Sequence, residues 1–310
     1  MTLTATKPHL IYLAGKWVDS PDRLEVANPA DPANPAGATY NATEAQYEEA
    51  VTAAVAAFRE TRVLPVYERS RALREISTGI RERREELGRI LSLEAGKPLR
   101  DALVEVDRSV FTFRLAAEEA ERMLGEVIPL DLVAASRGRF GITRRFPVGP
   151  VAGISPFNFP LNLAAHKIAP AIAAGCSIVL KPATKDPLTI LTVGEIIDSV
   201  GLPAGAVSIL PMTRELGDRM VSDPRFKLLT FTGSPSVGWR MKERAGKKKV
   251  VLELGGNAAV IIDATADVDW RSSGSSSAAS AMRASRASAS SGSTSTRRSP
   301  TRSARSSSPV

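Results

Sequence analysis

The stretch from Gly149 to Leu254 alternates short apolar segments with longer amphipathic ones. Short apolar strands separated by helices of 8–15 residues are typical of a parallel, doubly wound α/β sheet, which is the predicted fold class. Ligands of such sheets bind outside the carboxyl ends of the strands, where Phe157, Lys181, Gly233 and Glu253 fall. The expected strands are 150–154, 177–181, 207–210, 228–231, 249–254 and 258–262, and the expected helices are 161–174, 187–200, 213–221 and 235–245.

The residues before this stretch predict mainly helices. Thr43 and Gln46 have the spacing of a capping box, which opens a helix through about Arg59. The alternation within 137–146 predicts an exposed two-stranded hairpin, protruding at about 137–149. The other expected elements are a strand with a Gly-Lys turn at 10–18, a loop at 26–37 and helices at about 66–94 and 98–124.

The last 40 residues differ in composition from the rest of the chain. They contain 17 Ser and seven Arg, and no Leu, Ile, Phe, Trp or Tyr. Such a segment buries too little apolar surface to offset its conformational entropy. We therefore expect a folded region at 1–270 and a disordered Ser/Arg-rich tail at 271–310. The tail is either natural or the product of a shifted reading frame, because GC-rich codons read out of frame give Ser, Arg, Ala, Thr, Gly and Pro.

Composition narrows the classes of function. The net charge of +8 falls to +1 when the seven Arg of the tail are set aside, so no nucleic-acid partner is expected. No run of 18 uncharged apolar residues predicts a membrane span, and the N-terminus lacks a secretory pattern. A single cysteine excludes an intrachain disulfide framework and fits the reducing cytoplasm, which is the predicted location.

Two polar residues lie at positions typical of catalytic side chains. Glu253 ends an apolar strand and precedes Gly255 and Gly256, as a catalytic base at the mouth of a sheet would; the alternative is a strand-ending Glu before a turn. Asn158 lies between Pro156 and Pro160, whose fixed φ stiffens the loop for an amide that stabilises an oxyanion. The alternative is an ordinary turn Asn.

For two further reactive side chains the sequence predicts a structural role rather than a catalytic one. Cys176 begins an expected buried strand and is assigned to the core, although it is the only thiol. His166 is expected on a helix surface or between helices. No metal site is predicted.

Four blocks in order, ISPFNFP (154–160), IVLKPAT (178–184), LLTFTGSPSVG (228–238) and KVVLELGGNAAV (249–260), resemble the aldehyde dehydrogenase superfamily over roughly residues 10–270. The resemblance implies a Rossmann-like cofactor domain without its catalytic domain, a small aldehyde substrate, NAD or NADP, and a homo-oligomer. It implies that Glu253 is the base, that Asn158 binds the thiohemiacetal oxygen and that Lys181 binds the adenosine ribose. The cofactor-binding residues that it implies are Ile154, Ser155, Pro156, Phe157, Lys181, Thr184, Gly233, Ser234, Gly238 and Leu254.

The chain also departs from the family pattern. Thr184 stands where many NAD-preferring members carry Glu, so NADP is permitted. The segment LPMTRELG (210–217) lacks glycines that many members have there. No cysteine follows Glu253. However, codons can be chosen for the tail so that restoring one G after the Trp270 codon shifts the reading frame. The shifted frame then contains GQ-x-C, the family's nucleophile motif. That cysteine codon straddles Arg286 and Ala287, 34 positions after Glu253.

The function expected from the resemblance is NAD(P)⁺-dependent oxidation of a small aldehyde to its carboxylic acid, with this chain itself inactive because it lacks the nucleophile. One alternative is a non-catalytic nucleotide-binding fragment or pseudogene product. Another is an Arg/Ser-tailed binding protein.

Overall fold

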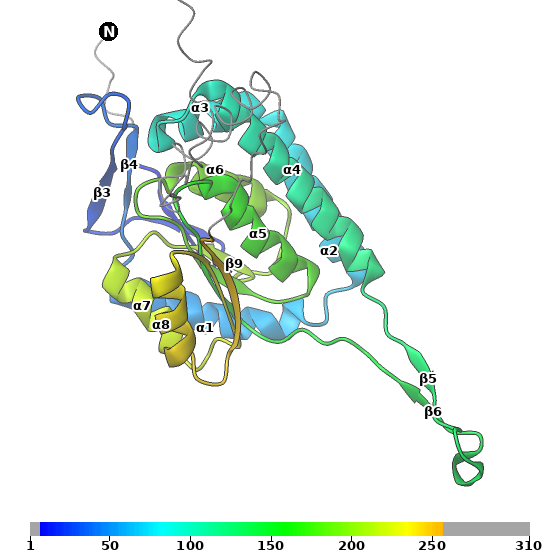
Figure 1. The fold of residues 1–310 in the computed structure, drawn as a ribbon. Coiled ribbons are helices and arrows are strands. Elements are labelled where there is room, and N and C mark those ends of the chain that lie inside the picture. Colours follow the sequence, from blue (N-terminus) through cyan, green and yellow to red (C-terminus); the bar gives the residue numbers. More distant parts are fainter. Residues whose placement is uncertain (1–6, 257–310) are drawn as a thin grey trace, which may run out of the picture. The chain divides into compact units, whose positions relative to one another are not determined.

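The computed structural model describes residues 7–256, and a seven-stranded sheet lies at its centre (Figure 1). The strands follow the order β11-β10-β7-β8-β9-β1-β2. Their bounds are Ile11–Leu13 (β1), Lys16–Val18 (β2), Val151–Ile154 (β7), Ile178–Lys181 (β8), Val207–Ile209 (β9), Leu228–Gly233 (β10) and Lys249–Leu254 (β11). All of them belong to one unit that runs to Leu254. The predicted strand 258–262 and tail 271–310 lie outside the described residues.

Five of these strands, β11, β10, β7, β8 and β9, run parallel. The segment 10–18 adds two antiparallel strands, with Tyr12 of β1 beside Ile209 of β9 and β2 beside β1. The mostly parallel sheet is confirmed, and every predicted strand between 150 and 254 is present within three residues of its expected ends.

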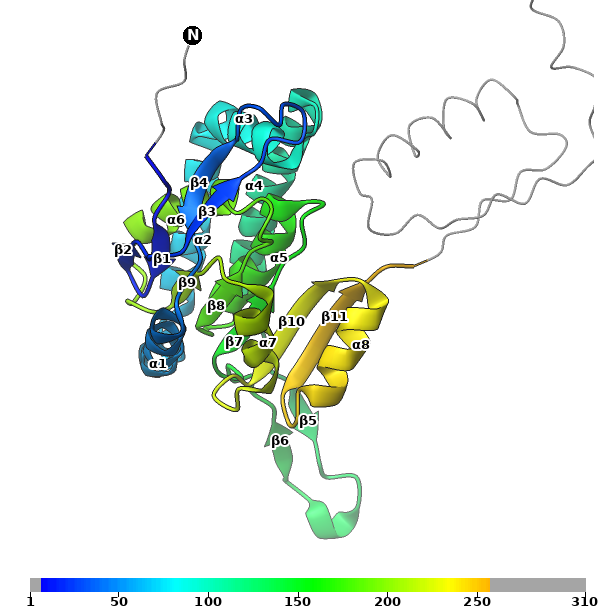
Figure 2. The ribbon, with the colours of Figure 1, turned by 90° about the vertical axis from the view of Figure 1, so that its left-hand side faces the viewer.

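Helices cover both faces of the sheet (Figures 1 and 2). Successive strand residues point to opposite faces, so the sheet divides two apolar cores. In β8, Ile178 and Leu180 pack in the core that includes α5 and α6, whereas Val179 packs in the core that includes α1 and α7. The helices are α1 (Glu44–Thr61), α2 (Val66–Glu82), α3 (Arg84–Ala95), α4 (Leu99–Arg122), α5 (Pro160–Ala173), α6 (Leu188–Ser199), α7 (Arg214–Ser222) and α8 (Pro235–Arg244).

Two helix predictions have different outcomes. The capping box is confirmed, since Thr43 Oγ1 accepts a hydrogen bond from Gln46 N and the Gln46 side chain accepts one from Thr43 N. The single helix predicted at 66–94 is wrong, because the chain breaks at Arg83 between α2 and α3. No Gly or Pro marks this break in the sequence. The Arg83 guanidinium binds Glu86 and, on α6, Glu195, so a contact distant in sequence accompanies the corner.

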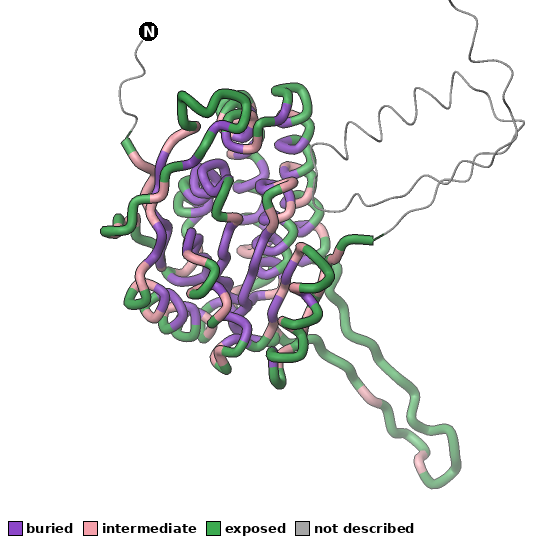
Figure 3. The backbone as a smooth tube through the Cα atoms, turned by 60° about the vertical axis from the view of Figure 1, so that its left-hand side comes forward, coloured by how far each residue is buried: buried purple, intermediate pink, exposed green. Residues whose placement is uncertain are grey.

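The hairpin is displaced from its predicted position. Its strands are β5 (Val127–Pro129) and β6 (Phe140–Ile142), joined by a loop that contains a 3₁₀ turn at Ala134–Ser136. Only one strand therefore falls within 137–146. The hairpin is exposed and projects from the sheet (Figure 3). A second small ribbon, β3 (Arg23–Val26) with β4 (Gly37–Tyr40), flanks the predicted loop at 26–37.

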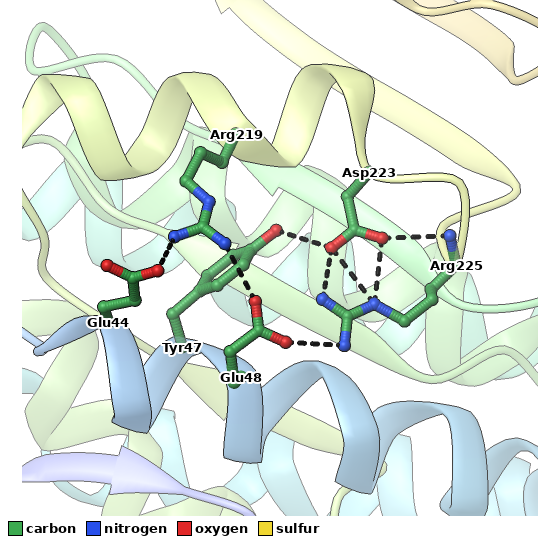
Figure 4. Close-up of polar contacts among 6 residues, drawn as sticks. All are labelled: Glu44, Tyr47, Glu48, Arg219, Asp223 and Arg225. Carbon is green, nitrogen blue, oxygen red and sulfur yellow. Dashed lines mark hydrogen bonds and ion pairs between the residues drawn. The ribbon is translucent and has the colours of Figure 1, made fainter.

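A polar cluster fastens α1 to α7 and the segment that follows it (Figure 4). The hydroxyl of Tyr47, a residue that is fully buried, donates to Asp223 Oδ2 at 3.0 Å. Arg225 pairs with both Asp223 (2.6 Å) and Glu48 (2.8 Å). Burial, followed by the charge of Asp223, raises the pKa of Tyr47, so the hydroxyl remains a donor.

No helix within the described residues is long and apolar enough to cross a membrane.

We expect Tyr47→Phe to lower the free energy of unfolding by about 1 kcal/mol, the usual net value of one hydrogen bond. The loss stays small because Asp223 keeps its contacts with Arg225. Urea unfolding measures it. The matched control is Tyr67→Phe, whose exposed hydroxyl binds Glu68, and which should change stability by less than ~0.5 kcal/mol. Equal losses in the two variants would contradict a role of the buried contact.

Candidate active site

The carboxyl ends of four parallel strands meet at one edge of the sheet. Ile154 lies level with Lys181 and Phe231, and Phe231 lies level with Leu252. The loop 155–159, the end of β8, the end of β10 and Glu253 therefore lie along the same edge. The topology brings these predicted site residues together, while their roles remain predictions.

Glu253 lies one residue beyond this level, beside Thr232 of β10. Its side chain is on the exposed part of β11. Solvent therefore reaches the carboxylate, as a base that activates water requires.

Lys167 is a site residue that the sequence did not reveal. It lies on α5, is 4% exposed, and donates to Thr230 Oγ1 (3.3 Å) and Thr232 Oγ1 (2.8 Å). Burial lowers the pKa of Lys167 to about 8, although the negative charge of Glu253 acts in the opposite direction. A lysine that shares electrostatic range with Glu253 can hold or release a proton near neutral pH. The only signal in the sequence is a lysine within a mainly apolar helix.

The loop after β7 carries Asn158. Its first residue, Ser155, is buried and donates its backbone N–H to Lys181 O at 3.1 Å. Pro156 is half-buried, and Phe157 is exposed with the Lys185 ammonium 5.6 Å from its ring centre. Among the described residues, Asn158 Oδ1 and Ser155 Oγ are buried without a hydrogen-bond partner. A polar group left in this way is a natural contact for a ligand.

The end of β8 forms a second part of the edge. Lys181 Nζ makes two long contacts, 3.3 Å to Pro182 O and 3.5 Å to Thr184 Oγ1. Burial, followed by the positive charge of Arg214, lowers the pKa of Lys181 to about 8. The Lys181 stem passes over Gly217 of α7, where a Cβ would approach its Cδ within 2.5 Å. An ammonium held by such weak contacts fits the hydroxyls or phosphate of a nucleotide.

The loop between β10 and α8 forms a third part. Ser234 caps α8 without a side-chain hydrogen bond, and the first helical residue is Pro235. The free N–H groups of the next turn suit a pyrophosphate. Gly238 has a packing role, since a Cβ there would collide with Leu254 of β11, and a Cβ at Gly233 would collide with the Phe231 ring.

The two residues assigned to structure occupy different settings. Cys176 is 4% exposed and precedes β8, as expected of a core residue. His166 lies on the exposed surface of α5. Partial burial of its ring, followed by the charges of Arg108 and Lys167, lowers the pKa of His166, and the charge of Glu253 opposes them. The Arg108 guanidinium of α4 lies 5.8 Å from the ring centre of Phe159, next to Asn158.

A parallel sheet with ligand-binding loops at its carboxyl edge defines the class of doubly wound nucleotide-binding proteins. A sequence model of the aldehyde dehydrogenase family matches residues 17–291. The 3-sulfolactaldehyde dehydrogenase of Priestia aryabhattai is 38% identical over 273 residues, which are 88% of this chain and 57% of the relative.

Two solved structures agree with this match. Aldehyde dehydrogenase 21 of Physcomitrella patens, in complex with the reaction product succinate, has a TM-score of 0.81 and 48% identity, over 86% of this chain and 56% of that one. The NADP-dependent glyceraldehyde-3-phosphate dehydrogenase of Bacillus halodurans C-125, complexed with NADP, has a TM-score of 0.82 and 32% identity, over 86% and 57%.

The chain belongs to the aldehyde dehydrogenase family. The predicted resemblance is confirmed, and with it an oxidoreductase family acting on aldehydes with NAD or NADP. The chain spans 57% of the sulfolactaldehyde relative, and the family match runs past Trp270 to residue 291.

Proposed function

We propose that this chain is the nucleotide-binding part of an NAD(P)⁺-dependent aldehyde dehydrogenase that oxidises a small aldehyde to its carboxylic acid. The observation that carries the proposal is the common edge of the sheet at which Lys181 ends β8, Glu253 lies next to the end of β11, and the loop with Asn158 follows β7. The expected setting remains the cytoplasm, and a homo-oligomer is part of the same proposal.

In this function each residue has a distinct task. The Asn158 amide, in a loop stiffened by Pro156 and Pro160, stabilises the oxygen that becomes negative when the aldehyde carbon turns tetrahedral. Glu253 takes a proton from the water that hydrolyses the acyl intermediate. Lys167, near Glu253, helps to hold or pass on that proton. The nicotinamide cofactor, when bound, accepts the hydride.

The two helices beside Asn158 favour an aldehyde that carries a negative group. Arg108 on α4 and His166 on α5 lie within electrostatic range of each other. Both side chains are exposed. Arg108 supplies the positive charge, whereas His166, whose pKa is lowered, offers a neutral hydrogen-bonding ring near pH 7. The relatives act on or bind sulfolactaldehyde, glyceraldehyde-3-phosphate and succinate, all of which are anionic. We propose a small anionic aldehyde as the substrate class.

The alternative, a non-catalytic nucleotide-binding fragment, rests on the missing nucleophile. The sequence holds a single cysteine, and Cys176 is buried before β8. A thiolate must reach the aldehyde carbon to act. As it stands, this chain would bind the cofactor without completing the reaction.

Cofactor binding tests the proposal on the chain as it is. We expect the wild type to bind NADP⁺, because Thr184 is exposed beside Lys181 and carries no negative charge. Thr184→Glu should weaken NADP⁺ binding about tenfold more than NAD⁺ binding, through repulsion of the 2′-phosphate. Titration calorimetry with both cofactors gives the ratio of the two dissociation constants.

The control variant is Thr52→Glu, which adds the same charge on the exposed surface of α1 and should leave the ratio unchanged. A ratio equally unchanged in Thr184→Glu would show that Thr184 does not face the ribose. Absence of binding of either cofactor to the wild type would contradict the proposed function itself.

A further inference from the structure

A buried ion pair lies directly behind the Asn158 loop. Lys97, between α3 and α4, binds Glu105 of α4 with 2.6 Å between Nζ and Oε2. Their side chains are only 5% and 1% exposed. Removing two charges from water is costly, and their attraction offsets that cost only when further hydrogen bonds satisfy them. The other contacts of both groups therefore show what the pair does.

Lys97 also holds the backbone of Asn158. Its Nζ donates to the Asn158 carbonyl oxygen at 3.1 Å. The same ammonium lies 4.8 Å from the ring centre of Phe159, the next residue, which adds a cation–π contact. The position of the Asn158 peptide thus depends on a charged group from outside its loop.

Glu105 holds the other end of this segment. Its Oε1 accepts from Leu161 N at 3.0 Å and from Asn162 N at 3.1 Å, in the first turn of α5. Phe159, the N-cap residue of α5, offers no side-chain hydrogen bond. Glu105 therefore supplies, from α4, the cap that α5 lacks, and its charge also complements the helix dipole.

We propose that Lys97 and Glu105 are positioning residues for the Asn158 amide. The pair fixes residues 158–162 at both ends, so that the side chain of Asn158 keeps one orientation toward the substrate oxygen. This inference rests on the proposed function, in which Asn158 stabilises the oxyanion. Neither residue touches the substrate; each acts through the backbone that carries Asn158.

Selective labelling makes the proposal testable on the 310-residue chain. The sequence has only six asparagines, so [¹⁵N]asparagine labelling gives six side-chain amide pairs; they are Asn28, Asn34, Asn41, Asn158, Asn162 and Asn257. The Asn158 pair is assigned by its loss in Asn158→Asp. In Lys97→Met we expect this pair to shift and broaden, while the pairs of Asn34 and Asn41 stay in place. The matched control is Lys16→Met, which breaks only the exposed pair with Glu49 and should move none of them.

Glu105→Gln provides a second variant that keeps the side-chain volume. We expect the backbone amide of Asn162, labelled in the same sample, to exchange with solvent roughly tenfold faster, because a charged acceptor becomes neutral. This arm applies even if Lys97→Met does not fold.

Two results would overturn the proposal. In the first, Lys97→Met lowers the unfolding temperature but leaves the Asn158 amide pair at its wild-type shifts, as a merely structural pair would. In the second, Glu105→Gln leaves the exchange of the Asn162 amide unchanged. Both are independent of the cofactor titration, whose failure would contradict the proposed function and not this role of the pair.

Discussion

The 310-residue chain is expected to form no NADH or NADPH from any aldehyde, whichever cofactor it binds. The family reaction begins with attack of a cysteine thiolate on the carbonyl carbon. The single cysteine, Cys176, is 4% exposed and lies in the core before β8, away from the carboxyl edge of the sheet. Absorbance at 340 nm, followed with a panel of small anionic and neutral aldehydes, should show no rate above that without protein.

A coding sequence with one G restored after the Trp270 codon provides the positive control. We expect it to restore aldehyde-dependent reduction of the cofactor, because codons that encode the tail can be chosen so that this frame contains the GQ-x-C motif. In that protein Asn158→Ala should lower kcat on the order of 100-fold, the effect of losing one oxyanion donor. Activity in the 310-residue chain that Cys176→Ser abolishes would refute the prediction, since it would make the buried thiol the nucleophile.

Local patterns were sufficient to predict the sheet and the edge at which the site lies. Each strand from Val151 to Leu254 is a short apolar run next to a helix. The hydrophobic periodicity of a strand and that of a helix can both be recognised in the sequence without knowledge of distant contacts. Because parallel strands end at the same edge, the residues that follow each strand can be grouped from the order of the strands in the chain. The capping box of Thr43 and Gln46 is equally local and was confirmed.

The remaining features depend on contacts that cross the sequence. The break at Arg83 coincides with an ion pair to Glu195, which is 112 positions away. Lys167 of α5 donates to Thr232 of β10, 65 positions on, and lies within electrostatic range of Glu253. Lys97 reaches the Asn158 carbonyl 61 positions on. A charged residue by itself predicts solvent exposure, so partners of this kind emerge only when the helices are placed.

The same helical layer buries two carboxyl groups near the loops of the site. Glu94 of α3 accepts from the backbone N–H groups of Leu188 (2.6 Å) and Thr189 (3.0 Å), and so caps α6. Burial raises the pKa of Glu94 to about 7. Asp186 is 2% exposed, and its Oδ1 has no hydrogen-bond partner among the described residues. Burial, followed by the charge of Glu94, raises the pKa of Asp186 to about 9.

We expect Asp186→Asn to stabilise the protein at pH 7.5 and to leave its stability nearly unchanged at pH 3.5. Below the ordinary pKa of 3.8 the carboxyl is protonated in both the folded and the unfolded chain, so it contributes no difference. Between 3.8 and about 9 the unfolded chain ionises while the folded one keeps its proton, so stability falls as the pH rises. Asparagine has no proton to lose, and the gain at pH 7.5 is several kcal/mol, at most about 5.

Urea unfolding of both proteins at the two pH values measures this difference. The control is Asp131→Asn, in the exposed loop of the hairpin, which should alter stability by less than ~0.5 kcal/mol at either pH. Loss of stability in Asp186→Asn at pH 7.5 would show the opposite arrangement, in which Asp186 is ionised in the folded protein and stabilised by Lys97, the positive charge with the largest effect on its pKa. Removing that carboxylate would then leave Glu105 as the negative partner of Lys97. The cost would be full above the ordinary pKa of 3.8 and would fade as the pH falls through the lowered folded-state pKa.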